Sequence, residues 1–243
     1  MKTIILWLRS ALFQVLMYGG MAVVGIVFAP WALFSNKGAI AGARAFANYT
    51  RWALAFAAGI KTEIRGEIPQ GEILLGSKHE SFMDIIMQLS VLPRPKFVMK
   101  RELLYTPIVG QYALRLGCIP VDRGKGRQAI RKMKEEVISG RADPGQLIIY
   151  PQGTRVAPGE KRPYKGGIVT LYQEMGTACV PVAVNHGTFW PKRSFLRYPG
   201  TAVMEFLPAI PAGLEGADML KQLETAVETA SANLRAEAAR ARD

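Results

Sequence analysis

The most prominent feature of the hydrophobic pattern is an uncharged segment near the N-terminus. No charged residue occurs between positions 10 and 36, and most positions in this segment are apolar. A helix needs about 20 such residues to cross a bilayer, so the segment is long enough to do so. A second apolar run, residues 45–60, follows the turn-like sequence SNKG. The pattern therefore predicts an N-terminal hydrophobic helical hairpin over residues 1–60 that anchors the chain to a membrane.

The sequence leaves the placement of this hairpin open. Basic residues flank both apolar runs, so the Lys and Arg bias that orients spanning helices indicates no clear crossing. One spanning helix and a hairpin lying in a single leaflet are both compatible with the pattern. Two helices buried in a protein core are the third alternative. A cleaved signal peptide fits poorly, because its apolar segment is only about 7–15 residues long.

Beyond residue 60, short apolar runs alternate with helix-like segments. This alternation predicts an α/β domain over residues 61–243, with a mainly parallel sheet flanked by helices. The predicted strands lie at residues 72–77, 96–100, 118–121, 146–150, 178–184 and 201–210, the last of them at an edge of the sheet. The predicted helices lie before residue 92, at residues 102–117, 127–139 and 166–176, and from residue 218 onward.

Composition narrows the class of protein. A length of 243 residues suits one α/β domain with a substantial core. The formal net charge of +12 fits nucleic acid, an anionic membrane surface or a phosphorylated ligand, and does not choose among them. Cys118 and Cys179 lie far apart and outside any C-x-x-C pattern. We therefore expect no metal site, no disulfide framework and a reducing compartment.

The most informative candidate chemistry is a histidine in the loop after the first strand of this domain. Ligands of parallel sheets bind at the carboxyl ends of the strands. His79 lies there, and Asp84 follows five residues later. Histidine is the usual general base near neutral pH, and an aspartate on its second nitrogen fixes the tautomer. The two side chains can meet if His79 precedes the helix and Asp84 lies in its first turns.

This pair has no nucleophile of its own. Ser81 is two residues from His79, where capping of the helix is the simpler role. The pair is therefore suited to deprotonating a hydroxyl group of the substrate, in an acyl transfer that needs no covalent acyl-enzyme. The alternative is a histidine that only satisfies hydrogen bonds in the core.

A second loop, residues 122–129, matches the pattern G-x-G-x-x-A between a strand and a helix. Asp143, about 20 residues further on, precedes the next strand instead of ending it, which argues against a dinucleotide fold. Arg123, Lys125 and Arg127 crowd the loop, so a phosphate-binding loop fits better. A solvated basic helix start is the alternative.

A third loop, PQGTR, follows the strand at residues 146–150. Gly153 permits close approach of the backbone, and Arg155 offers a planar fork suited to phosphate. His186 ends another strand and faces the same edge of the sheet, where we expect a structural imidazole.

Together these segments resemble the 1-acylglycerol-3-phosphate O-acyltransferase family, which is similar to the glycerol-3-phosphate acyltransferases. The shared H-x(4)-D motif runs from His79 to Asp84. The other matching segments are KREL with Lys100, GCIPVDRG with Arg123, QGTR at residues 152–155, and VPVAV. Their order and spacing over about residues 73–185 are more specific than any single block.

The resemblance implies a glycerol-3-phosphate acyltransferase-like fold and assigns roles to individual residues. His79 is the base, and Asp84 orients it. The residues implied in substrate binding are Lys100, Arg123, Gln152, Gly153, Thr154 and Arg155. The implied reaction moves an acyl group to the sn-2 hydroxyl of 1-acylglycerol-3-phosphate and gives phosphatidic acid. Acyl-CoA or acyl carrier protein supplies the acyl group as a co-substrate, and no cofactor or metal is implied.

The family motif normally reads Glu-Gly-Thr-Arg, so Gln152 departs from it and leaves the acceptor open. An acyltransferase for another lysolipid, such as lyso-ornithine lipid or a lysophospholipid, is the first alternative. A non-enzymatic protein that binds anionic lipid is the second. The resemblance further implies an inner-membrane protein whose catalytic domain faces the cytoplasm, with the bilayer and a lysophospholipid as partners and no nucleic acid.

Overall fold

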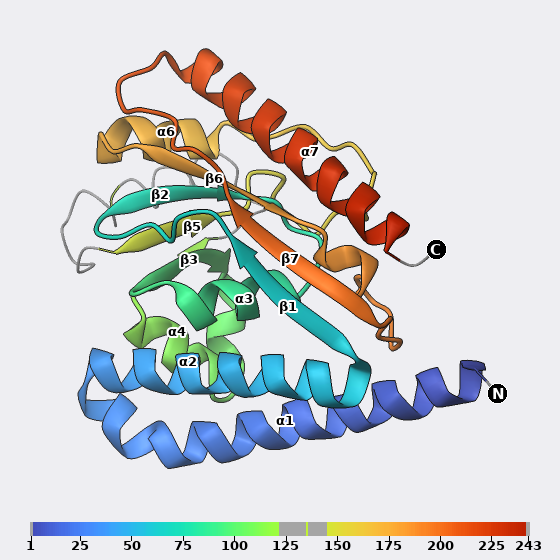
Figure 1. The fold of residues 1–243 in the computed structure, drawn as a ribbon. Coiled ribbons are helices and arrows are strands. Elements are labelled where there is room, and N and C mark those ends of the chain that lie inside the picture. The colour runs from blue at the N-terminus through green and yellow to red at the C-terminus, as the bar shows by residue number, and fades with distance from the viewer. Residues whose placement is uncertain (1, 122–134, 136–144, 242–243) are drawn as a thin grey trace.

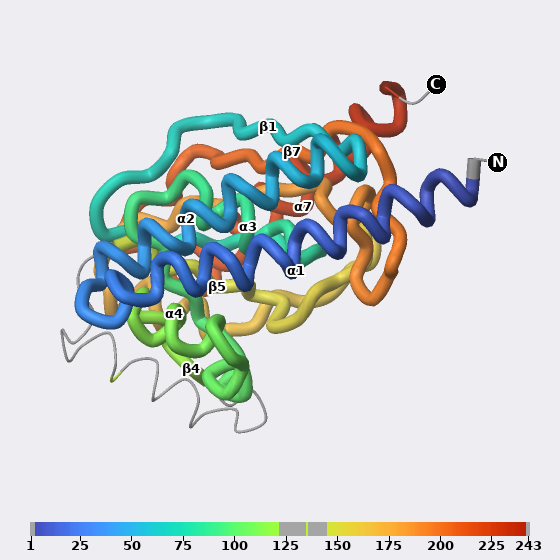
Figure 2. The backbone as a smooth tube through the Cα atoms, turned by 90° about the horizontal axis from the view of Figure 1, so that it is seen from below, coloured from blue at the N-terminus to red at the C-terminus, as the bar shows by residue number. Residues whose placement is uncertain are grey.

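The computed structural model describes residues 2–121, 135 and 145–241. Within these ranges a single sheet lies between two layers of helices (Figure 1). The N-terminal hairpin that the sequence predicts is present in the lower layer. α1 (Lys2–Phe34) and α2 (Asn36–Ala53) meet at Ser35, whose hydroxyl accepts a hydrogen bond from the Lys37 N–H and so caps α2. The two helices lie side by side in both views (Figures 1 and 2).

α1 has one apolar side buried against the protein and another that faces outward. Residues 3–34 form one helix long and apolar enough to cross a membrane. Phe13 is fully buried in the core. In contrast, Val15, Val23 and Val27 are 62–70% exposed. Such a continuous exposed apolar surface marks an interaction site, because water disfavours it.

Seven strands of the described residues form the sheet. They are β1 (Ile60–Arg65), β2 (Ile73–Ser77), β3 (Pro95–Lys100), β4 (Ile119–Val121), β5 (Gln146–Ile149), β6 (Cys179–Val184) and β7 (Gly200–Phe206). Their order across the sheet is β1-β7-β6-β2-β5-β3-β4. The five strands from β6 to β4 are mutually parallel, while β7 is antiparallel to β6 and parallel to β1. The prediction of a mainly parallel sheet is confirmed.

The predicted position of the last strand was wrong. β7 is not an edge strand, because β1 pairs with it from Ile60 opposite Gly200 to Arg65 opposite Glu205 and occupies the edge itself. The hydrophobic pattern did not reveal β1, since its sequence IKTEIR carries charges at half of its positions. Charged, partly exposed side chains are common on edge strands, where they discourage pairing with other chains.

Helices cover both faces of the sheet (Figure 1). On β2, Leu74 packs in the cluster of the upper helices, and the next residue, Leu75, packs in the cluster of the lower helices, as the two-residue period of a strand requires. The helical segments after α2 are η1 (Leu54–Ala58), α3 (Met83–Val91), η2 (Arg101–Tyr105), α4 (Val109–Arg115), α6 (Gly167–Met175), η4 (His186–Thr188) and α7 (Gly216–Arg240). Except for residue 135, the predicted helix at 127–139 lies outside the described residues.

The strand order determines which loops meet at one edge of the sheet. β2 has β5 on one side and β6 on the other, all three parallel. The loops that carry His79, Gln152 and His186 therefore leave neighbouring strands at their carboxyl ends. Lys100 ends β3, one strand beyond β5. The sequence predicts that the loops after β2, β4 and β5 share one edge; this is confirmed for the loops after β2 and β5, and the loop after β4 lies outside the described residues.

Candidate active site

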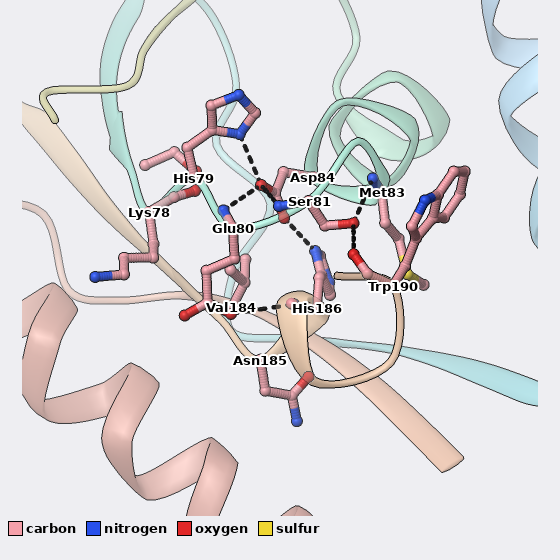
Figure 3. Close-up of polar contacts among 12 residues, drawn as sticks. Lys78, His79, Glu80, Ser81, Met83, Asp84, Val184, Asn185, His186 and Trp190 are labelled. Atoms are coloured by element: carbon pink, nitrogen blue, oxygen red, sulfur yellow. Dashed lines mark hydrogen bonds and ion pairs between the residues drawn. The ribbon is translucent and has the colours of Figure 1, made fainter. Parts of the chain in front are cut away.

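The H-x(4)-D segment folds as a strand, a turn and a helix. α3 begins at Met83, so Asp84 lies in its first turn and His79 in the turn before it. His79 Nδ1 lies 2.7 Å from Asp84 Oδ2, and the other ring nitrogen points away from Asp84 (Figure 3). The imidazole stacks on the Tyr150 ring at a centroid distance of 3.9 Å and is 8% exposed. His79 thus precedes the helix and Asp84 lies in its first turn, which is the arrangement that the contact between the two side chains requires.

Asp84 is fully buried and bound by several donors. Besides His79, its Oδ2 accepts hydrogen bonds from the backbone N–H groups of Glu80 at 2.8 Å and Ser81 at 2.9 Å. Burial alone would raise the pKa of Asp84, but the hydrogen bonds from His186 and His79 outweigh it and hold the pKa well below its ordinary value. Asp84 is therefore an anion, and His79 donates through Nδ1, which leaves Nε2 as a lone-pair acceptor.

His186 occupies the second oxygen of the same carboxylate. Its Nδ1 lies 2.7 Å from Asp84 Oδ1, and both side chains are fully buried (Figure 3). The sequence predicted a structural imidazole at the same edge but did not indicate this partner. No local signal could have revealed the contact, because 102 residues separate the two side chains.

Ser81 has no free hydroxyl for a nucleophilic role. Its Oγ donates a hydrogen bond to the Trp190 carbonyl at 2.7 Å and accepts one from the Met83 N–H at 3.2 Å. Met83 is the first residue of α3, so Ser81 Oγ accepts from the first N–H of the helix, although the N-cap residue is Phe82 and makes no side-chain cap hydrogen bond.

The two neighbours of His79 in the sequence are both ion-paired to α7. On one side, Lys78 is 1% exposed, and its Nζ contacts the two carboxylate oxygens of Glu228 at 2.7 and 2.8 Å. On the other side, Glu80 accepts from the Gly187 N–H at 3.1 Å and from Arg235 Nη1 at 3.3 Å. These contacts attach the loop to the C-terminal helix.

Glu80 has an unusual electrostatic environment. Burial raises its pKa, and the negative charge of Asp84 raises it further, to about 7, against the opposing effects of the Gly187 N–H, Arg235 and Lys78. Glu80 faces Gly187 and α7 and bonds to neither histidine in the structure. We infer that Glu80 stabilises the conformation of the loop that carries His79.

Gln152 points into the protein interior. It is 1% exposed, and its Nε2 makes long contacts with the Arg162 carbonyl at 3.4 Å and Glu228 Oε1 at 3.5 Å. Among the described residues its Oε1 has no hydrogen-bond partner. Tyr164 also donates to Glu228 Oε1, at 3.0 Å. Position 152 therefore adjoins a partly buried carboxylate that α7 provides.

The rest of the third loop lies beside the base. Gly153 has a φ of 71°, a conformation that favours glycine. Lys192 Nζ contacts the Arg155 carbonyl at 2.8 Å and Thr154 Oγ1 at 3.4 Å. The partly exposed Arg155 guanidinium makes no hydrogen bond to the described residues. The Val156 N–H donates to the His79 carbonyl at 2.8 Å, so a backbone hydrogen bond joins this loop to the base.

The other predicted binding residues lie further away or beyond the description. Lys100 is exposed at the end of β3 and pairs with Glu102 at 2.9 Å. Arg123, the glycine pattern of residues 124–129 and Asp143 fall outside the described residues. Within the described ranges, no group of three or more His, Cys, Asp or Glu side chains is placed to hold a metal ion.

Comparison with known proteins gives consistent results. A family model described as Acyltransferase matches residues 59–185, just over half of the chain. The 1-acyl-sn-glycerol-3-phosphate acyltransferase of Pseudomonas aeruginosa is 30% identical over 183 residues, which cover 74% of this chain and 71% of that protein. The lyso-ornithine lipid O-acyltransferase of the same organism is 27% identical over 237 residues, which cover 87% and 89% respectively.

A solved structure confirms the fold. The crystal structure of the 1-acyl-sn-glycerophosphate acyltransferase PlsC from Thermotoga maritima matches 97% of this chain and 98% of its own, with a TM-score of 0.81 at 20% identity. The H-x(4)-D geometry, the family model and the 30% identity together support one conclusion. The chain belongs to the 1-acyl-sn-glycerol-3-phosphate acyltransferase family.

Proposed function

We propose that this acyltransferase moves a fatty acyl group from a thioester of coenzyme A or acyl carrier protein to the sn-2 hydroxyl of 1-acylglycerol-3-phosphate, giving phosphatidic acid. The observation that carries the proposal is His79 with Nδ1 bound to an ionised Asp84 and Nε2 directed away from it at the edge of the sheet (Figure 3). The name of the Pseudomonas aeruginosa acyltransferase supports the choice of acceptor.

In this mechanism His79 Nε2 takes the proton of the acceptor hydroxyl while the oxygen attacks the thioester carbonyl. Asp84 stabilises the imidazolium that forms. The tetrahedral intermediate then collapses and the C–S bond breaks. Protonated His79 gives its proton to the departing thiolate, which leaves as a thiol. No acyl-enzyme forms, which agrees with the commitment of Ser81 Oγ to Trp190 and Met83.

A second acceptor is favoured by two observations. The lyso-ornithine lipid O-acyltransferase aligns with more of this chain than the 1-acyl-sn-glycerol-3-phosphate acyltransferase of the same organism does. Position 152 is a glutamine instead of the motif's glutamate. The same base would then act on the hydroxyl of a lysolipid with an amino-acid head group.

The deciding experiment incubates the purified protein with a radiolabelled acyl thioester and a panel of lysolipids. We expect label in phosphatidic acid when 1-acylglycerol-3-phosphate is supplied. Exclusive labelling of ornithine lipid would assign the second acceptor. No labelled lipid from any acceptor, with either CoA or acyl carrier protein thioester, would refute the proposed activity.

We propose that Arg155 holds the acceptor phosphate. Its side chain is unpaired within the described structure, and its backbone lies next to Val156, which bonds to His79. Arg155→Ala should raise KM for 1-acylglycerol-3-phosphate about ten- to hundredfold, because a charge-assisted hydrogen bond is lost. KM for the acyl thioester should change little, and Arg193→Ala, on another loop, is the control. Equal weakening toward both substrates would contradict the assignment.

We propose that α1 places the enzyme on the cytoplasmic membrane with the active site facing the cytoplasm, where acyl thioesters are available. Val23 and Val27 are exposed on α1 one turn apart. Val23→Asp with Val27→Asp should move the protein from the membrane fraction to the soluble fraction, since an aspartate at the centre of a membrane helix costs about 3 kcal/mol. The matched control is Val23→Ala with Val27→Ala. If the aspartate variant still sediments with the membrane fraction in high salt, this face of α1 does not anchor the protein.

A further inference from the structure

Asp84 carries two imidazoles, one on each carboxylate oxygen. His79 reaches Oδ2 from the loop after β2, and His186 reaches Oδ1 from η4, after β6, each at 2.7 Å (Figure 3). The proposed mechanism uses only His79. The second imidazole therefore needs a separate explanation.

The surroundings of His186 exclude it as the base. Its side chain is fully buried, so no substrate hydroxyl reaches it. Its Nδ1 donates to the ionised Asp84, and among the described residues its Nε2 has no hydrogen-bond partner. Protonating Nε2 would bury a donor without an acceptor, a costly arrangement. His186 is thus a neutral imidazole with its hydrogen on Nδ1.

Its bond determines the state of the carboxylate. Without His186, Oδ1 would be a buried charged oxygen with no side-chain donor among the described residues, and these residues would hold the carboxylate only through Oδ2. The hydrogen bond from His186 also draws negative charge toward Oδ1, away from His79. Among the described residues, Glu80 also carries a charge close to Asp84. The positive charges of Arg235 and Lys78 counter the charge of Glu80.

We propose that His186 is a positioning residue that fixes the rotation of the Asp84 carboxylate and moderates how strongly Asp84 stabilises protonated His79. This inference rests on the proposed function, in which His79 is the base. It makes the end of β6 part of the catalytic apparatus, although His186 touches no substrate.

The first test compares His186→Leu with His186→Asn. Leucine fills a similar volume without a donor, whereas asparagine offers an N–H near the position of Nδ1. In His186→Leu we expect kcat to fall about tenfold or more, the effect of losing a hydrogen bond to a charged group. The full charge of Asp84 then acts on the imidazolium of His79 and stabilises it more strongly. The acid limb of kcat/KM should therefore move to higher pH.

His186→Asn should keep the wild-type acid limb and most of kcat. Equal losses in the two variants, with an unshifted acid limb, would mean that His186 only fills space and would overturn the proposal. His79→Ala distinguishes the two hypotheses: activity retained in that variant refutes the assignment of His79 as the base, whatever the His186 variants show.

A second measurement needs no variant. The chain has only two histidines, so ¹⁵N-histidine labelling gives two imidazole spin systems. We expect the ring of His186 to show a hydrogen on Nδ1 and a bare Nε2 at every pH at which the enzyme is active. A hydrogen on Nε2 of His186 would overturn the proposal even if His186→Leu fails to fold.

Discussion

Replacing His79 with alanine is expected to lower kcat for acyl transfer by at least about 10²–10⁴-fold, the usual contribution of a general base. No neighbour can take over the proton, because the Ser81 hydroxyl is committed and His186 is sealed from the substrate. His79 lies in the loop between β2 and α3, outside any helix or strand, so the variant should keep its secondary structure. Circular dichroism and kcat on the acceptor identified by the lysolipid panel test both points.

Asp84→Asn should also cost most of the activity, because an amide cannot stabilise the imidazolium and disturbs its tautomer. The pair should act as a unit. We therefore expect the double variant to be no slower than His79→Ala alone, a strongly non-additive result. If His79→Ala retains more than about a tenth of wild-type kcat, His79 is not the general base.

Glu228→Gln is expected to destabilise the fold by about 2–4 kcal/mol. The substitution leaves Lys78, which is 1% exposed, without its counter-ion, and breaking a buried pair from one side is costly. The estimate is below the full value for buried pairs, because the Glu228 side chain is 33% exposed. Urea unfolding of the wild type and the variant in the same detergent measures the difference in their free energies of unfolding. Lys78 directly precedes His79, so kcat should fall as well.

The rescue experiment uses Gln152, whose amide lies 3.5 Å from Glu228 Oε1. Gln152→Glu combined with Glu228→Gln returns one carboxylate to this site and places it where the family motif has its glutamate. We expect this pair to recover at least half of the lost stability. Gln152→Glu alone should destabilise the fold, since it adds a buried carboxylate beside the one that Glu228 already provides. Wild-type stability in Glu228→Gln would show that the ion pair does not stabilise the fold.

The sequence predicted the features that depend on residues close together in the chain, and missed those that depend on contacts between distant segments. The hairpin and the strand-turn-helix at His79 are local patterns, and both were predicted. Asp84 is five residues from its partner, within reach of one turn. β1 was missed because its charged positions hide the alternation, and its pairing with β7 then displaced the predicted edge.

The missed part of the site depends on contacts between distant segments. Lys78 and Glu228 are 150 residues apart, and only the packing of α7 brings them together. A buried lysine beside a candidate base looks, in sequence, like a solvated charge. The role of Gln152 in substrate binding stays a prediction, but its contact with Glu228 of the last helix was not predicted. Such pairs follow from the tertiary fold and have no signature in a local pattern.

The backbone hydrogen bond from Val156 to the His79 carbonyl has a consequence for substrate choice. It joins the backbone next to the proposed head-group anchor, Arg155, to the backbone of the base, so we expect the span between these two backbone positions to change little when substrate binds. The enzyme would then select acceptors by the distance between their anionic group and their free hydroxyl. A lysolipid whose anionic group lies the right number of bonds from its free hydroxyl brings that hydroxyl to His79. A longer or shorter head group binds with its hydroxyl out of reach.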